Sequence, residues 1–313
     1  MREGFGVYSF DDNADPWGMS REQLTRLGIN GRKFQPSKEP DGIFKGLKSV
    51  QVIEDGDIYL GIEAFFELDS SRARILYKIY KNNDDVDIDL TLFMGDINKI
   101  IKLALPLSAE GTLIGQTAFG TDKLFMDGRE NVAHRFVAVD SGESSVALLN
   151  KGVYGSHYEN GCLYMSLVRG VTYCAHPIGE RELIPNDRFT KKIDQGENSY
   201  SFRLTAANRD QLERKATEFV EKPYALNIFP IPSKVSTKEL NISLGGNIIS
   251  MPTVKKIYEK DAVIFRLLNN TPNSVNSYIQ VNDMRLDLTF GKYEVKTVIY
   301  ENGKLTESYE LLI

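Results

Sequence analysis

The sequence predicts an all-β protein built from antiparallel sheets, and three observations lead to this class. From Lys48 onward apolar and polar residues alternate with a period of two, the pattern of half-buried strands. Turn residues such as Asp55-Gly56 and Asn160-Gly161 separate these short runs, and an Asn-Gly pair favours a tight hairpin because both residues accept positive φ. Helical periodicity is confined to two short segments.

The N-terminal part contains the first of these helices. After a turn, residues 20–27 fit a helix in which Ser20 is the N-cap and Gln23 completes a capping box. Gly28 supplies the stop, and the polar segment 30–46 is expected to be an extended loop. The sole tryptophan, Trp17, is expected to anchor this helix, although an aromatic ring beside carboxylates would also suit a sugar.

The middle of the chain is expected to form a large sandwich. Its predicted strands after residue 64 are Arg74–Tyr80, Val86–Phe93, Lys99–Leu107, Phe136–Val139, Val146–Leu149, Cys162–Val168 and Tyr200–Leu204. Alternation places Asp85, Asp87 and Asp89 on one face of a strand, and we expect that face to be solvated. Residues 181–195 are charged and lack a period, which predicts a loop.

A second helix and a second sandwich follow. Residues 208–220 carry an apolar stripe, and Lys222-Pro223 ends the helix. Beyond Pro232 the predicted strands are Glu239–Leu244, Val254–Tyr258, Ala262–Leu268, Val281–Phe290, Val295–Tyr300 and Ser308–Leu312, which is typical of a small immunoglobulin-like β-sandwich. We therefore predict a large β-sandwich domain over 1–222 and a small one over 223–313.

Composition narrows the classes of function. The net charge of −5, from 38 basic and 43 acidic residues, argues against nucleic acid as a partner. No apolar run reaches the length of a membrane span, and the N-terminus lacks a signal-peptide core, so a cytoplasmic location is expected. The two cysteines, Cys162 and Cys174, are expected to be free thiols.

Groups with catalytic or metal-binding spacing are not apparent. His134, His157 and His176 are far apart in the sequence and form no zinc motif, and each is expected to be an ordinary surface or core residue. Arg169 follows an apolar strand, where it either rims a site or ties a loop down through Asp187 or Glu180. We expect no catalytic residue, metal or other cofactor in this chain.

Five segments in order resemble the C-terminal half of bacterial glycoside hydrolase family 38 α-mannosidases. They are the Asp11–Met19 segment DDNADPWGM, Val146–Asn150 followed by Tyr154-Gly155, Leu163–Gly170, Tyr173–Ile178, and Asp194–Glu197 leading into Tyr200–Leu204. The match covers residues 8–205, and the terminal module fits by position more than by motif. The resemblance implies that the large sandwich of this chain is of the galactose-mutarotase-like (super)sandwich type.

The resemblance implies a function that depends on another domain. The family carries its catalytic residues and a zinc ion in an N-terminal α/β barrel, so this chain is expected to be the non-catalytic portion, inactive by itself. Its expected partners are that barrel and mannose-containing oligosaccharides, and the face toward the barrel makes a homodimer a further expectation. By position, Tyr173, His176, Asp187 and Arg188 are the implied residues at the rim of the substrate site.

Two other functions stay open. The chain can be read as a stand-alone carbohydrate-binding or mutarotase-like module, since sandwiches of this type occur in several sugar-processing proteins. It can also be read as an interaction or oligomerisation module, which rests on the terminal sandwich.

Overall fold

The structure is a computed structural model, and it confirms the predicted all-β class. It describes residues 4–12, 31–38, 48–107, 110–171, 192–225, 240–246, 248–258 and 260–309. The chain divides into two compact units, one of residues 1–115 with 122–209 and one of residues 116–121 with 210–313. The predicted division after residue 222 would leave the second helix with the first unit instead, and it stays a prediction.

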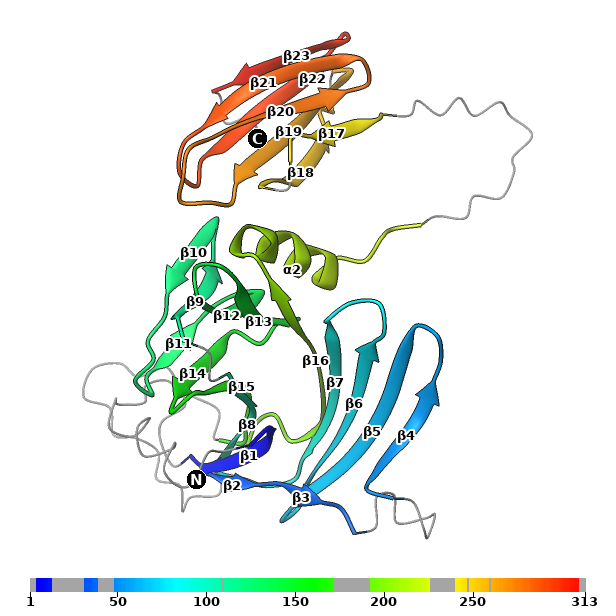
Figure 1. Ribbon diagram of the computed structural model, residues 1–313, viewed down its shortest axis with the longest axis vertical. Coiled ribbons are helices and arrows are strands. Elements are labelled where there is room, and N and C mark those ends of the chain that lie inside the picture. Colours follow the sequence, from blue (N-terminus) through cyan, green and yellow to red (C-terminus); the bar gives the residue numbers. More distant parts are fainter. Residues whose placement is uncertain are drawn as a thin grey trace. The chain divides into compact units, whose positions relative to one another are not determined.

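The first unit contains two antiparallel sheets (Figure 1). The six-stranded sheet has the order β11 (Glu130–Val132), β14 (Gly155–Glu159), β15 (Cys162–Arg169), β8 (Lys99–Pro106), β1 (Gly6–Asp11) and β2 (Arg32–Lys33). The ten-stranded sheet has the order β10 (Gly120–Lys123), β9 (Thr112–Thr117), β12 (Phe136–Asp140), β13 (Ser145–Asn150), β16 (Gly196–Ala207), β7 (Val86–Met94), β6 (Ser71–Tyr80), β5 (Tyr59–Leu68) and β3 (Gln35–Pro36), with β4 (Val50–Asp55) also paired to β5.

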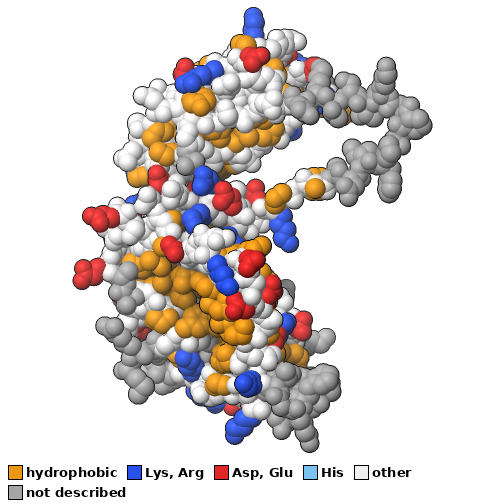
Figure 2. Space-filling view, turned by 45° about the vertical axis from the view of Figure 1, so that its right-hand side comes forward, with side chains coloured by type: hydrophobic (Ala, Val, Ile, Leu, Met, Phe, Trp, Pro, Cys, Tyr) orange, Lys and Arg blue, Asp and Glu red, His pale blue; other side chains and the backbone are white. Residues whose placement is uncertain are grey.

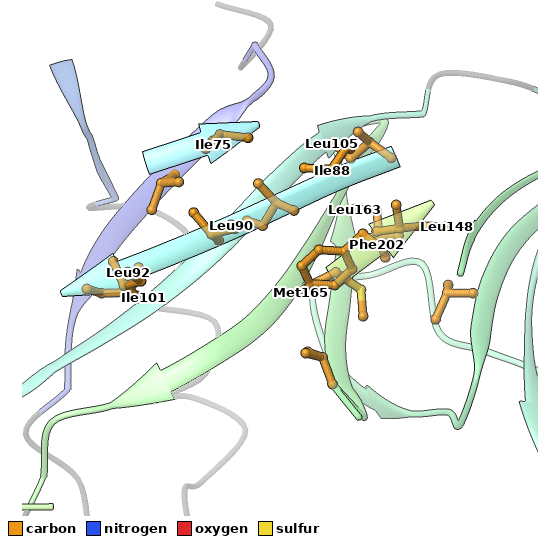
Figure 3. Close-up of a cluster of buried hydrophobic side chains, with 14 of the residues drawn as sticks. Ile75, Ile88, Leu90, Leu92, Ile101, Leu105, Leu148, Leu163, Met165 and Phe202 are labelled. Carbon is orange, nitrogen blue, oxygen red and sulfur yellow. The ribbon is translucent and has the colours of Figure 1, made fainter. Parts of the chain in front are cut away.

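The core of this unit lies between the two sheets. Figure 3 shows the side chains that meet there: Ile75 and Leu90 from β6 and β7, Ile101 from β8, Met165 from β15 and Phe202 from β16. Each of these residues is at most 1% exposed. The alternation that predicted the strands therefore directs every second residue into one shared core.

The second unit combines one short helical segment with a small sandwich. A single 3₁₀ turn, η1 (Arg209–Gln211), precedes α2 (Leu212–Val220), which confirms the second predicted helix; the first, residues 20–27, lies outside the described residues. The three-stranded sheet is β17 (Ile242–Leu244), β20 (Val275–Val281) and β21 (Met284–Phe290), and the four-stranded sheet is β18 (Ile249–Lys256), β19 (Ala262–Asn269), β22 (Val295–Glu301) and β23 (Lys304–Ser308). One core containing Phe265, Ile279, Phe290 and Val298 belongs to both sheets.

Two predicted strands differ from the structure. Strand β23 ends at Ser308, where the predicted strand Ser308–Leu312 begins, and residues 310–312 lie outside the described residues. Val281–Phe290 is not a single strand, because the turn between β20 and β21 interrupts it at Asn282. Asn282 has φ of 54°, a conformation that asparagine tolerates better than most residues and that reverses the chain here. By contrast, the Asn-Gly turns at Asn160 and Asn302 have the positive φ that the sequence predicted.

The outer face of β7 also differs from the expectation. Asp85, Asp87 and Asp89 do share a face, but they are held in a polar network rather than freely solvated. Arg203 on the neighbouring strand β16 pairs with Asp87 through Nε at 2.5 Å and Nη2 at 2.9 Å. The neighbouring carboxylates accept hydrogen bonds from Thr205 and Ser201 of the same strand. The charges therefore bind two central strands together.

Replacing a buried aromatic residue by alanine should destabilise the fold more than replacing an exposed one. Phe202→Ala removes a ring that is 0% exposed, and we expect it to lower the free energy of unfolding by about 3–5 kcal/mol. Phe93→Ala removes a ring that is 50% exposed, so its cost should be below about 1 kcal/mol. Urea unfolding of both variants measures the difference, and equal costs would contradict the described core.

Candidate functional site

The candidate site lies on the outer face of the six-stranded sheet. On β8, Ile101 and Leu103 point into the main core, so Lys102 between them points to the opposite face. Small residues and aromatic rings surround it there, and a second apolar cluster includes Tyr8, Phe10, Ile100, Ala104, Cys162 and Tyr164. Lys102 is fully buried although it is a charged residue. A buried lysine requires partners, and the sheet supplies them.

Lys102 forms an ion pair with Glu130 and a hydrogen bond with His157. Its Nζ contacts Glu130 Oε1 and lies 2.9 Å from His157 Nδ1. Two strands separate β8 from β11, a span of about 14 Å at roughly 4.8 Å per strand spacing. The side chains of Lys102 and Glu130 bridge this span together, and the lysine extends over Ser166, its direct neighbour on β15. The pair therefore ties the edge strand β11 to the centre of the sheet.

The tautomer of His157 follows from this contact. A lysine ammonium only donates hydrogen bonds, so Nδ1 accepts and the neutral imidazole carries its proton on Nε2. Among the described residues Nε2 has no hydrogen-bond partner, although the side chain is only 5% exposed. The ring stacks on Tyr164 with centroids 4.5 Å apart and planes inclined by 10°. One donor of the cluster is therefore buried without a partner in the part of the chain that the structure describes.

Burial and neighbouring charges shift the pKa values of the groups in the cluster. Burial lowers the pKa of Lys102, and Glu130 opposes this. Burial alone would raise the pKa of Glu130, but the contacts with His157 and Lys102 outweigh it and lower that pKa to about 2. Burial also lowers the pKa of His157. At neutral pH the cluster thus contains a carboxylate that stays ionised beside a neutral imidazole.

A second ion pair lies at the end of β15. Arg169 donates through Nε to Asp12 Oδ2 at 2.6 Å and through Nη2 to Asp12 Oδ1 at 3.0 Å. The Asp12 side chain is 0% exposed. Arg169 therefore holds the end of the N-terminal strand. Its expected contact with Asp187 or Glu180 stays a prediction, because those two lie outside the described residues.

The predicted rim residues Tyr173, His176, Asp187 and Arg188 all lie outside the described residues, as do Trp17 and Cys174. Cys162 is a buried free thiol. Within the described ranges no three His, Cys, Asp or Glu side chains are grouped so that they could hold a metal ion, and no helix there is long and apolar enough to cross a membrane. Sequence reasoning missed Lys102 and Glu130, and it treated His157 as an ordinary histidine.

The fold defines the class as an all-β protein with two sandwiches. The sequence model of the glycosyl hydrolases family 38 C-terminal domain matches residues 13–186, so the chain belongs to this family. This confirms the resemblance found in the sequence motifs. A search of curated proteins found no match.

Two solved structures share the fold. A glycosyl hydrolase family 38 protein from Enterococcus faecalis superimposes with a TM-score of 0.73 at 11% sequence identity. The superposition covers 95% of the present chain and 40% of the Enterococcus chain. An alpha-mannosidase from Enterococcus faecalis V583 gives a TM-score of 0.70 at 11% sequence identity, and the superposition covers 94% of the present chain and 38% of the mannosidase chain. At this identity the likeness concerns the fold, and the present chain spans about two fifths of each relative's length.

Substituting Glu130 should destabilise the fold more than substituting Lys102. Glu130→Gln leaves the fully buried Lys102 without a counter-charge, and we expect a loss of about 3–5 kcal/mol in the free energy of unfolding. Lys102→Met leaves Glu130, which is 26% exposed and can be hydrated, so the loss should be smaller. Urea unfolding compares the variants, and a larger cost for Lys102→Met would contradict this asymmetry.

His157 should make stability depend on pH. Its pKa is lowered in the fold from 6.5, so as the pH falls through that value the unfolded chain gains a proton that the folded chain resists, and stability decreases. Glu130 adds a further loss as the pH falls from 4.5 toward about 2. His157→Gln should flatten the change between about pH 7.5 and 5.5.

The matched control is His134→Gln, because His134 is exposed. Unfolding midpoints in urea at each pH measure the slope. If both substitutions flatten the profile equally, the burial of His157 is not its cause.

Proposed function

We propose that this chain is the non-catalytic β-sandwich portion of an α-mannosidase-type glycoside hydrolase, and that it supports and rims an active site carried by a zinc-binding α/β barrel domain. The observation that carries the proposal is the family match over residues 13–186. The solved relatives support it, since they share the fold over almost all of this chain and are about 2.5 times as long. One of them is described as an alpha-mannosidase.

The surface of the first unit supports a role in contact with another domain. Figure 2 shows hydrophobic side chains gathered in a hollow on one side of this unit. Its exposed large hydrophobic residues include Val50, Val52, Ile53, Ile58 and Ile79 of the β4–β6 region. Apolar surface of this kind is typical of a face that another domain or subunit covers. The homodimer stays a prediction for the same surface.

The rim belongs to the same proposal. Tyr173, His176, Asp187 and Arg188 follow β15, and Arg169 at the end of that strand is fixed by Asp12. Because the Arg169–Asp12 pair fixes the end of β15, the segment that follows starts from a defined position. Such a position suits residues that have to reach the active site of a neighbouring domain. The sugar would be a mannoside held mainly by the barrel, and the zinc would be bound there.

The proposal predicts activity only when two parts are combined. The chain alone with added zinc should release no aglycone from an aryl α-mannoside above the background rate. A family 38 barrel domain alone should have a low kcat/KM, and the barrel joined to this chain should have a kcat/KM at least tenfold higher, because the sandwich orders the barrel-side residues.

The three samples control one another. Turnover by the chain alone at enzymatic rates would contradict the non-catalytic role. Equal kcat/KM for the barrel with and without the chain would contradict the supporting role. Rapid interconversion of α- and β-sugars by the chain alone would instead favour a mutarotase-like module.

A further inference from the structure

The outer face of the six-stranded sheet opens toward its edge beside Glu130. Across the sheet the row Val132, Gly155, Ser166 and Lys102 runs from the edge strand β11 to the central strand β8. Lys102 is fully buried, Gly155 and Ser166 are half-buried, and Val132 is 70% exposed. The row thus becomes progressively more accessible toward β11.

Gly155 leaves this opening unfilled. Among the residues that the structure describes, a Cβ atom built on Gly155 would meet Ser166 alone, with Cβ at 3.4 Å and Oγ at 3.7 Å. The position therefore has room for a side chain or for the group of a ligand. Val132 beside it adds apolar surface, and Ser166 adds a hydroxyl group.

Glu130 presents one carboxylate oxygen to this opening. Its Oε1 is held by Lys102, whereas the hydrogen bond that Oε2 accepts within the described ranges is a long one of 3.4 Å from Ser166. The buried lysine fixes the carboxylate before any ligand arrives, so an acceptor is oriented in advance. The Glu130 side chain is 26% exposed, so the carboxylate is only partly covered.

The balance of charge and hydrogen-bonding capacity selects the ligand class. Lys102 and Glu130 neutralise each other and His157 is neutral, so the cluster offers no net charge to an ion. The hydrogen-bonding groups beside Gly155 are an acceptor, Glu130 Oε2, and the hydroxyl group of Ser166. A hydroxyl group is both donor and acceptor, and a neutral polyhydroxylated molecule satisfies such a set.

We propose that Glu130, Ser166 and Gly155 form a binding subsite for a neutral sugar on the outer face of the six-stranded sheet, with Lys102 and His157 as positioning residues. That the sugar is a mannoside rests on the proposed function. The carboxylate accepts a hydrogen bond from one sugar hydroxyl, Ser166 bonds a second, and Val132 contacts the C–H surface of the ring.

The test is a titration of the ¹⁵N-labelled chain with methyl α-mannoside, followed by amide chemical shifts. We expect saturable shifts at Val132, Gly155 and Ser166, with a dissociation constant on the order of 1 mM for so few hydrogen bonds. Inorganic phosphate should give none, because the cluster carries no net charge. Saturable phosphate shifts at these amides, or no saturable sugar shifts, would overturn the proposal.

Two variants locate the site. Glu130→Gln should weaken binding about 10- to 100-fold through loss of the charged acceptor. Because this change also leaves Lys102 unpaired, Gly155→Val is the second variant: it fills the opening without burying a charge and should abolish binding. Its matched control is Gly120→Val in β10, where the nearest atom to a built Cβ is 3.7 Å away. Undiminished binding by folded Gly155→Val overturns the proposal.

Methyl β-galactoside separates this inference from the proposed function. If methyl β-galactoside shifts these amides as strongly as methyl α-mannoside does, a sugar subsite is supported but its assignment to mannose is overturned. Loss of the sugar shifts with intact turnover by the chain joined to the barrel would overturn the subsite and leave the proposed function standing.

Discussion

The burial of both faces of β8 is the constraint on which the first unit depends. Ile101, Leu103 and Leu105 fill the core between the sheets, and the alternating residues of the strand face a second buried layer. Lys102 belongs to that second layer, so its charge has to be matched within the protein. Glu130 on the edge strand β11 supplies the opposite charge. The ion pair therefore requires the strand order that brings β11 within reach of β8.

The strands were predictable wherever an alternating pattern faces one core. Val86–Met94 and Ser71–Tyr80 follow the expected period, and both Asn-Gly turns have the expected backbone. The sequence did not indicate β10 or β11, because short edge strands need few apolar residues. The turn at Asn282 was missed because apolar residues on both sides resemble one continuous strand.

The cluster around Lys102 was only partly accessible from the sequence. A lysine within the apolar run Lys99–Leu107 signals a strand buried on both faces, and such a lysine must be paired. Its partners could not be named, since Glu130 and His157 are 28 and 55 positions away and meet it only through the strand order. Pairing across several strands is a property of topology, which local periodicity does not encode.

The chemistry of the cluster favours binding and positioning over proton transfer. A general acid or base works best with a pKa near the operating pH, where it can both hold and release a proton. Glu130 has a pKa of about 2, so near neutral pH it stays an ionised acceptor. The contacts that make Glu130 unsuited to acid–base catalysis also fix its geometry, since Lys102 holds one carboxylate oxygen and Ser166 donates a long hydrogen bond to the other. A preoriented, ionised acceptor on a rigid sheet is suited to recognising hydroxyl groups, as the proposed subsite requires.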